Sequence, residues 1–240
     1  GGRVPAGAIL GFVGGIAALF ALFVGFQARE LFLDSAAFQA LTGVTIADYA
    51  RRGFFELLVV AVLTLPMLLA AEWLLAKGEG GDARWFHRLT AAVLLLLGLV
   101  LASAYQRMLL YRDYYGMTED RFYALVFMTY LALVCVWFAA TVLRDRRSRF
   151  VPGVLAGGYA MLFFLNLVNP DAVVARVNLQ RAGAGAPLDV AYLGRLSADA
   201  VPTILDAVRD LPPTDGCLLV ESVRSRWGVG SKPDGDWNLS

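Results

Sequence analysis

Apolar residues gather in about five long runs up to residue 168, and short polar stretches separate these runs. The runs cover residues 4–27, 53–76, 87–110, 122–143 and 150–168. Each is close to the roughly 20 residues that a helix needs to cross the hydrocarbon core of a bilayer. Because a backbone inside lipid must satisfy its own hydrogen bonds, the pattern predicts about five transmembrane helices.

Residues 31–50, between the first two runs, are too polar to cross a membrane. Apolar side chains such as Leu31, Phe32 and Phe38 still recur among the polar ones. This pattern is typical of a short amphipathic helix that lies in the membrane interface. We therefore expect an interfacial segment before the second span.

After residue 168 the chain becomes more polar, and residues 169–240 have the pattern of a small helical extramembrane domain. Glycine and proline residues divide it into short segments. We expect helices over residues 171–181, 188–196, 197–208 and 217–227. The predicted fold class is therefore all-α, a polytopic membrane protein with a transmembrane domain over 1–168 and a C-terminal helical domain.

Two features refine the predicted tail. Ser197 is a suitable N-cap for the third of its helices, because its hydroxyl can accept from the backbone there. Its short helices should bury an apolar stripe against one another. The expected stripe is Leu193, Leu196, Ile204 and Leu205.

Composition agrees with lipid as the solvent of most of the chain. Hydrophobic residues make up 58% and charged residues 17% of the sequence, whereas soluble domains carry about 25% charged residues. The net charge of +1 gives no sign of a nucleic-acid surface. Cys135 falls in an apolar run and Cys217 in the tail, so a disulfide within the chain is not expected.

Lysine and arginine residues are divided almost evenly between the loops on the two sides of the predicted membrane domain. The densest group, Arg144, Arg146, Arg147 and Arg149, follows the fourth run. Since positive loops stay in the cytoplasm, this loop is expected inside and the C-terminal domain outside.

Gly7, Gly11 and Gly15 recur every four residues in the first run. Such spacing forms a smooth helix face that another helix can approach closely. The ordinary explanation is packing within the chain. The functional alternative is contact with a protein partner, or with further transmembrane helices that precede this region.

Polar and charged residues gather at the predicted outer ends of the spans. If the alternating topology holds, they lie at one membrane face, where arginines can hold an anionic headgroup or a phosphate-bearing lipid carrier. The structural alternative is that they are interfacial anchors and ion pairs, such as Arg52 with Glu56 at i,i+4. The cluster comprises Arg51, Arg52, Glu56, Arg112, Asp113, Asn169, Asp171 and Arg176.

No pattern of catalytic residues stands out. The single histidine, His87, argues against a histidine-based metal site or a bis-histidine haem. The sequence also lacks a phosphate-binding loop, a nucleophile elbow and a CxxC pair. We therefore predict no catalytic residue, no metal and no cofactor.

Several segments together resemble a known bacterial membrane-protein family. Their order is similar to that in the family catalogued as domain of unknown function 4173, which is related to family 4153. The segments are YARRGFFEL at 49–57, LYRDYYGMT at 110–118, NPD at 169–171, ARVN at 175–178, LDVAYL at 188–193, LSADAVP at 196–202 and DWNLS at 236–240.

That resemblance implies a bacterial cytoplasmic-membrane protein whose helical tail is attached to its last span. Members of the family are typically longer, with additional spans ahead of this region, which fits a chain that begins Gly1-Gly2-Arg3. The family has no established activity, so the resemblance assigns no catalytic residue.

Two functions remain open from the sequence. The leading hypothesis is a non-enzymatic scaffold, sensor or accessory subunit of a membrane complex, surrounded by membrane lipids and one or more protein partners. The alternative is an envelope enzyme or transporter that handles a lipid-linked or anionic substrate at the outer face.

Overall fold

A computed structural model of the chain describes residues 5–31, 54–76 and 83–228, and these residues form helices and turns with no strand. The chain divides into two compact units. The first, here called the membrane unit, comprises Gly1–Arg112 and Ala124–Met161. The second, here called the tail unit, comprises Asp113–Tyr123 and Leu162–Ser240. The tail unit thus includes the end of α5 (Ala83–Tyr115), the start of α6 (Glu119–Thr141) and the end of α7 (Phe150–Val168).

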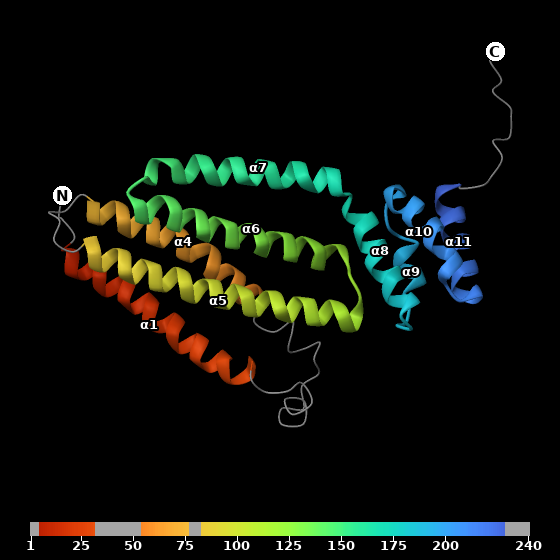
Figure 1. The fold of residues 1–240 in the computed structure, drawn as a ribbon, viewed down its shortest axis with the longest axis horizontal. Coiled ribbons are helices and arrows are strands. Elements are labelled where there is room, and N and C mark those ends of the chain that lie inside the picture. Colours follow the sequence, from red (N-terminus) through yellow and green to blue (C-terminus); the bar gives the residue numbers. More distant parts are fainter. Residues whose placement is uncertain (1–4, 32–53, 77–82, 229–240) are drawn as a thin grey trace, which may run out of the picture. The chain divides into compact units, whose positions relative to one another are not determined.

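The long helices are α1 (Ala6–Leu31), α4 (Phe54–Ala76), α5 (Ala83–Tyr115), α6 (Glu119–Thr141) and α7 (Phe150–Val168) (Figure 1). Among the described residues, four stretches are long and apolar enough to cross a membrane, and α4 contributes a shorter apolar stretch, Val59–Leu75. The predicted class, an all-helical polytopic membrane protein, is confirmed. The four stretches are Ala6–Phe26, Ala83–Tyr115, Glu119–Arg144 and Arg147–Val168.

The loop expected between the third and fourth spans is much shorter than the sequence suggested. Residues 111–115 are helical, because α5 continues to Tyr115 and only residues 116–118 separate it from α6. The predicted runs 87–110 and 122–143 left residues 111–121 as the loop between two spans, and for residues 111–115 that expectation was wrong. The polarity of Arg112 and Asp113 marks the end of the apolar stretch and not the end of the helix. The interfacial segment expected over 31–50 lies outside the described residues, apart from Leu31 at the end of α1.

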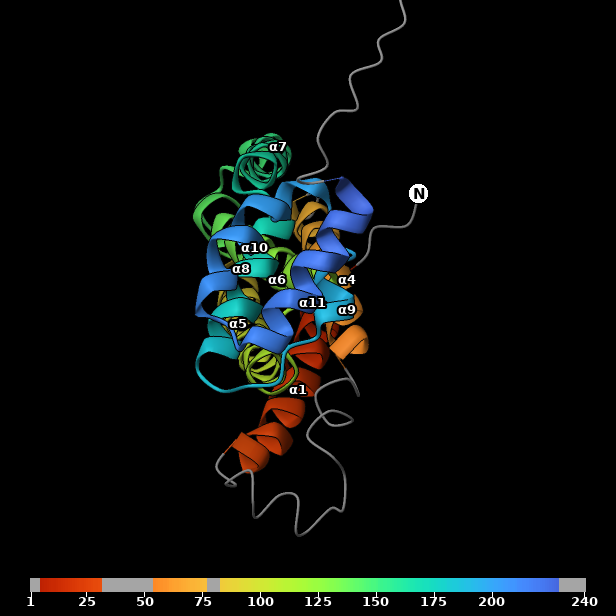
Figure 2. The ribbon, with the colours of Figure 1, turned by 90° about the vertical axis from the view of Figure 1, so that its right-hand side faces the viewer.

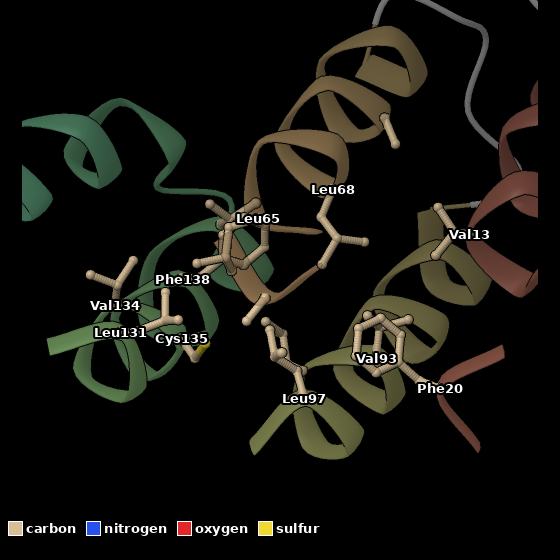
Figure 3. Close-up of a cluster of buried hydrophobic side chains, with 14 of the residues drawn as sticks. Val13, Phe20, Leu65, Leu68, Val93, Leu97, Leu131, Val134, Cys135 and Phe138 are labelled. Atoms are coloured by element: carbon tan, nitrogen blue, oxygen red, sulfur yellow. The ribbon is translucent and has the colours of Figure 1, made fainter. Parts of the chain in front are cut away.

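The core of the membrane unit is built mainly from apolar side chains of α1, α4, α5 and α6, and Phe150 of α7 is buried in it as well (Figure 3). Leu68 of α4, Leu97 of α5 and Phe138 of α6 are among its fully buried members. Val13 of α1 lies on the same cluster. Other apolar side chains of these helices are exposed, Leu95 at 69% for example, as expected of surfaces that meet lipid acyl chains.

A tight turn made of two short 3-10 helices, η1 (Val142–Arg144) and η2 (Arg147–Arg149), joins α6 to α7. Its own backbone closes it, because Arg146 N donates to Thr141 O at 2.8 Å. The first half of α7 then packs on α6, where the Tyr130 hydroxyl donates to Val154 O at 2.6 Å.

The tail unit continues with α8 (Pro170–Gly183), α9 (Val190–Leu193), η3 (Ala198–Ala200), α10 (Val201–Ala207), η4 (Val208–Asp210) and α11 (Pro213–Trp227). Figure 2 shows these short helices gathered in one cluster, in which α8 contacts α10 and α9 contacts α11. Proline at the first helical position suits α8 and α11, since that position needs no N–H donor.

Most of the expected tail pattern is present in the structure. Leu193, Leu196 and Ile204 are buried, as predicted, whereas Leu205 is 36% exposed and its expected burial was wrong. The helix expected over 188–196 covers only Val190–Leu193. Ser197 is the N-cap residue of η3, but its side chain makes no capping hydrogen bond.

Candidate functional site

The most elaborate polar arrangement in the tail unit surrounds the turn 116–118 between α5 and α6. Gly116 ends α5 with φ of 82°, a left-handed conformation that glycine adopts without steric cost. A β-carbon at this position would lie 2.5 Å from the Asn178 Oδ1 atom of α8. The turn therefore requires glycine for two reasons, its backbone conformation and the closeness of α8.

The Asn178 side chain binds both backbone groups of Met117. Met117 N donates to Asn178 Oδ1 at 2.8 Å, and Asn178 Nδ2 donates to Met117 O at 2.7 Å. Asn178 Nδ2 also donates to Val174 O, one turn back in α8, at 3.0 Å. The Asn178 amide thus satisfies the Met117 N–H and C=O groups, for which so short a turn supplies no backbone partner.

Two arginines bind the last carbonyls of α5, which have no partner within the helix. Arg181 Nη2 donates to Asp113 O at 2.8 Å and to Tyr114 O at 3.1 Å. Arg121 Nη1 donates to Tyr115 O at 3.2 Å and also to Gly116 O. A positive charge is favourable at this negative end of the helix dipole, so both contacts stabilise the end of α5.

Two further contacts join the start of α6 and α8 to the rest of the tail. Glu119 N donates to the Tyr192 hydroxyl at 3.0 Å, and Ser197 N donates to Asp171 Oδ2 at 2.9 Å. The pKa of Tyr192 is raised, mainly because the phenol is buried. The nearby Glu119 and Asp171 carboxylates raise the pKa further, whereas the hydrogen bond from the Glu119 N–H lowers it. The phenol is therefore held neutral, as the acceptor of this hydrogen bond.

An open cleft of about 440 Å³ lies beside this arrangement in the tail unit. Tyr114 and Tyr115 line it from α5, Arg181 lines it from α8, and Pro187, Leu188 and Asp189 line it from the segment before α9. Its volume is within the range of small-molecule sites, about 300–1,000 Å³. Its lining combines aromatic faces, a cation and an anion.

The membrane unit contains an ion pair that the sequence did not indicate. Arg147 Nη1 lies 3.0 Å from Glu72 Oε1, with half of the arginine side chain exposed and the Glu72 side chain 9% exposed. Glu72 Oε2 is buried and has no hydrogen-bond partner among the described residues.

The predicted polar cluster is only partly described, and its members have separate local roles. Arg51 and Arg52 lie outside the described residues, and of Glu56 only its place in α4 is described. Arg112 and Asp113 lie in the last turns of α5, and the Asp113 carbonyl accepts from Arg181. Within α8, Asn169 is the N-cap, Asp171 binds Ser197 N and Arg176 is exposed.

The glycines of α1 differ from those of α7 in what surrounds them. A β-carbon at Gly7, Gly11 or Gly15 would meet no described atom within 4 Å. A β-carbon at Gly153 would clash with the Trp137 ring of α6. Packing within the described part of the chain therefore explains the glycine of α7 and not those of α1.

The residues that fix the turn were missed at the sequence level, although signals for them exist. Gly116 lies between two helical stretches, the position of a helix-ending glycine. Asn178 lies in the middle of a helix, where a short amide is unfavourable unless it binds a backbone group. Neither signal identifies Met117 as the partner, because the contact joins residues 61 positions apart.

The chain was also compared with protein-family models. The family described as "Domain of unknown function (DUF4153)" matches residues 3–207. The resemblance drawn from the sequence named family 4173 and its relative, family 4153. The match shows family 4153 and does not show family 4173. Comparisons with curated proteins and with solved structures give no match.

Proposed function

This multi-pass membrane chain belongs to the DUF4153 family of unknown function, and from that premise we propose that it is a non-enzymatic scaffold or accessory subunit. The proposal rests on the hydrogen bonds that polar side chains make to the backbone around the turn 116–118. Asn178, Arg181 and Arg121 donate to backbone carbonyls there and so fix α8 to the end of α5. Donors used in this way build a rigid platform, on which short helices can present a surface to a partner.

The proposal places the protein in a bacterial cytoplasmic membrane, with its C-terminal domain outside. The support is the arginine-rich turn after α6, in which Arg144, Arg146, Arg147 and Arg149 are all exposed, together with the rule that such loops stay in the cytoplasm.

Cys217 offers a direct test of this orientation, because it is exposed whereas Cys135 is buried. A membrane-impermeant maleimide added to intact spheroplasts should label the protein at Cys217, and Cys217→Ser should abolish the labelling. Labelling that appears only after the membrane is permeabilised would reverse the orientation.

The proposed contact of the scaffold inside the membrane is the face of α1 formed by Gly7, Gly11 and Gly15, here called the glycine face. These residues are exposed, and no described atom fills the space beside them. Faces of small residues allow two helices to approach closely inside a bilayer. The occupant that we propose is a transmembrane helix of a partner protein.

The experiment is purification in a mild detergent followed by mass spectrometry, with Gly11→Leu compared with Gly98→Leu. Gly98 of α5 is also exposed and without a neighbour within 4 Å of a β-carbon, so it controls for the added side chain. We expect one reproducible partner that Gly11→Leu reduces and Gly98→Leu retains. A chain isolated alone, or equal retention by both variants, would contradict the proposal.

A further inference from the structure

The cleft beside Arg181 and Asp189 has a lining that scaffolding does not require. It presents one cation, one anion and the rings of Tyr114 and Tyr115, with Pro187 and Leu188 as apolar walls. Both tyrosines are about half exposed, at 54% and 53%. The side chains that surround this space thus offer complementary groups to a ligand that carries both charges.

The cleft lies at the depth of the lipid headgroups, as judged from α5. The apolar run of this helix ends at Leu110, and Arg112 follows two residues later. Tyr114 and Tyr115 lie four and five residues beyond Leu110, about 6–8 Å farther along the helix axis. The headgroup layer extends roughly 5–8 Å beyond the hydrocarbon core on each side, so the two tyrosines fall within that layer.

The end of α7, in the same unit, agrees with this depth. Phe163 and Leu167 are exposed at 68% and 69%, as expected of residues that face acyl chains. Asn169 and α8 follow directly, and Arg181 is carried by α8. The cleft therefore opens where the polar parts of phospholipids are the most abundant small ligands.

Arg181 retains donors for a phosphate. Its Nη2 atom donates to the carbonyls of Asp113 and Tyr114, whereas a guanidinium carries five N–H donors in all. Its hydrogen bonds to the described residues all come from Nη2, so the donors on Nε and Nη1 are left for a ligand while the backbone contacts hold the group in place. Such a fixed guanidinium suits a phosphate oxygen.

Asp189 selects against a purely anionic headgroup and in favour of an ammonium. Its Oδ1 atom accepts from Tyr192 N at 2.9 Å, and a carboxylate can accept several more hydrogen bonds. The rings of Tyr114 and Tyr115, which line the same cleft, supply aromatic surface that a cation can contact as well. A headgroup with no positive charge would leave the Asp189 carboxylate facing a phosphate without compensation.

We propose that this cleft binds the headgroup of a zwitterionic phospholipid of the phosphoethanolamine type. Arg181 binds the phosphate, Asp189 binds the ammonium, and Tyr114 and Tyr115 flank it. The bound lipid would anchor the tail unit to the membrane surface.

Native mass spectrometry of the full chain, released from nanodiscs of phosphatidylethanolamine and phosphatidylglycerol in equal amounts, tests this proposal. The wild type should retain phosphatidylethanolamine at least about fivefold over phosphatidylglycerol. Asp189→Asn should reduce that ratio to near one, and the fold should persist because asparagine is an equally good N-cap for α9. Asp199→Asn, at an exposed acid of η3, is the matched control and should leave the ratio unchanged.

Equal retention of both lipids by the wild type would overturn the proposal, and so would an unchanged ratio in Asp189→Asn. A Tyr114→Ala variant, which leaves both charges in place, should lower retention of phosphatidylethanolamine, and unchanged retention would equally count against the cleft. Addition of soluble phosphoethanolamine separates the two sources of this headgroup. If the free headgroup at millimolar concentration fails to displace the lipid, the result supports an intact phospholipid as the ligand. Full displacement of the lipid would overturn the proposal.

Discussion

The two turns at opposite ends of α6 are built on different principles. The α6–α7 turn is closed by its own backbone, with short 3-10 helices and Asp145 in the left-handed region at φ of 58°. The α5–α6 turn is only residues 116–118, and Asn178 of α8 satisfies both backbone groups of Met117. The first turn is therefore self-sufficient, whereas the second depends on a helix far away in the sequence.

This difference predicts how the α5–α6 turn becomes ordered. A turn that needs a distant helix for its hydrogen bonds is formed only when that helix is in place, so α8 and the turn should order together. The side chains of Arg147 and Trp137 add to a turn that already closes without them. Substitutions at the α5–α6 turn should accordingly cost more than substitutions at the α6–α7 turn.

Gly116→Ala should have the largest effect. The left-handed backbone costs a non-glycine residue about 1–2 kcal/mol, and a β-carbon would also displace Asn178. We expect a total loss of about 3 kcal/mol in thermal unfolding followed by circular dichroism in detergent. Gly185→Ala is the matched control, because Gly185 has φ of 91° but no neighbour within 4 Å of a β-carbon. Equal losses at the two glycines would show that the contact with Asn178 is unimportant.

Asn178→Leu should follow, with a loss of about 2 kcal/mol, because it leaves two partly buried backbone groups of Met117 without partners. Limited proteolysis should cleave the variant faster within residues 113–123 than the wild type. Asn166→Leu, at an exposed amide that binds only Leu162 O in its own helix, should behave like the wild type. A similar cleavage rate in the Asn178 and Asn166 variants would contradict the assignment.

Arg147→Gln should cost less, about 1 kcal/mol. Glu72 then lacks its cation, but half of the Arg147 side chain is exposed, so water screens the pair and can replace part of the contact. A double-mutant cycle with Glu72→Gln measures the coupling from denaturation midpoints. Coupling as large as the loss in Asn178→Leu would refute the contrast between the turns.

Trp137→Phe should have the smallest effect, about 0.5 kcal/mol. The indole N–H is shared between Arg149 O and Phe150 O, at 3.3 Å to each, and long shared bonds contribute little. The phenylalanine ring keeps part of the contact with Gly153. A shift in the denaturation midpoint larger than that of Arg147→Gln would show that the α6–α7 turn relies on this side chain.

The sequence sufficed for the features that depend on local pattern. Long apolar runs specify helices in a bilayer, and the buried Leu193, Leu196 and Ile204 follow from the apolar spacing of the tail. The contacts between Glu72 and Arg147 and between Met117 and Asn178 could not be predicted in this way. Each joins residues more than 60 positions apart, and local pattern does not report which distant groups meet.

The two tyrosines of the cleft illustrate the same limit. Tyr114 and Tyr115 follow the end of an apolar run, a position that is typical of interfacial aromatic residues. Their place beside Arg181 and Asp189 depends on how α8 and the segment before α9 return to α5. The sequence shows the residue types, but their arrangement around the cleft follows only from the fold.

Hydrogen–deuterium exchange at the Met117 amide tests most directly whether α8 holds the α5–α6 turn. The wild-type amide donates to Asn178 Oδ1 and should be protected. Asn178→Leu should speed its exchange at least about tenfold, which corresponds to 1.4 kcal/mol. The backbone amide of Arg146, which donates to Thr141 O in the self-closed turn, should exchange at its wild-type rate in the same variant. Equal Met117 exchange in the two proteins would contradict the account.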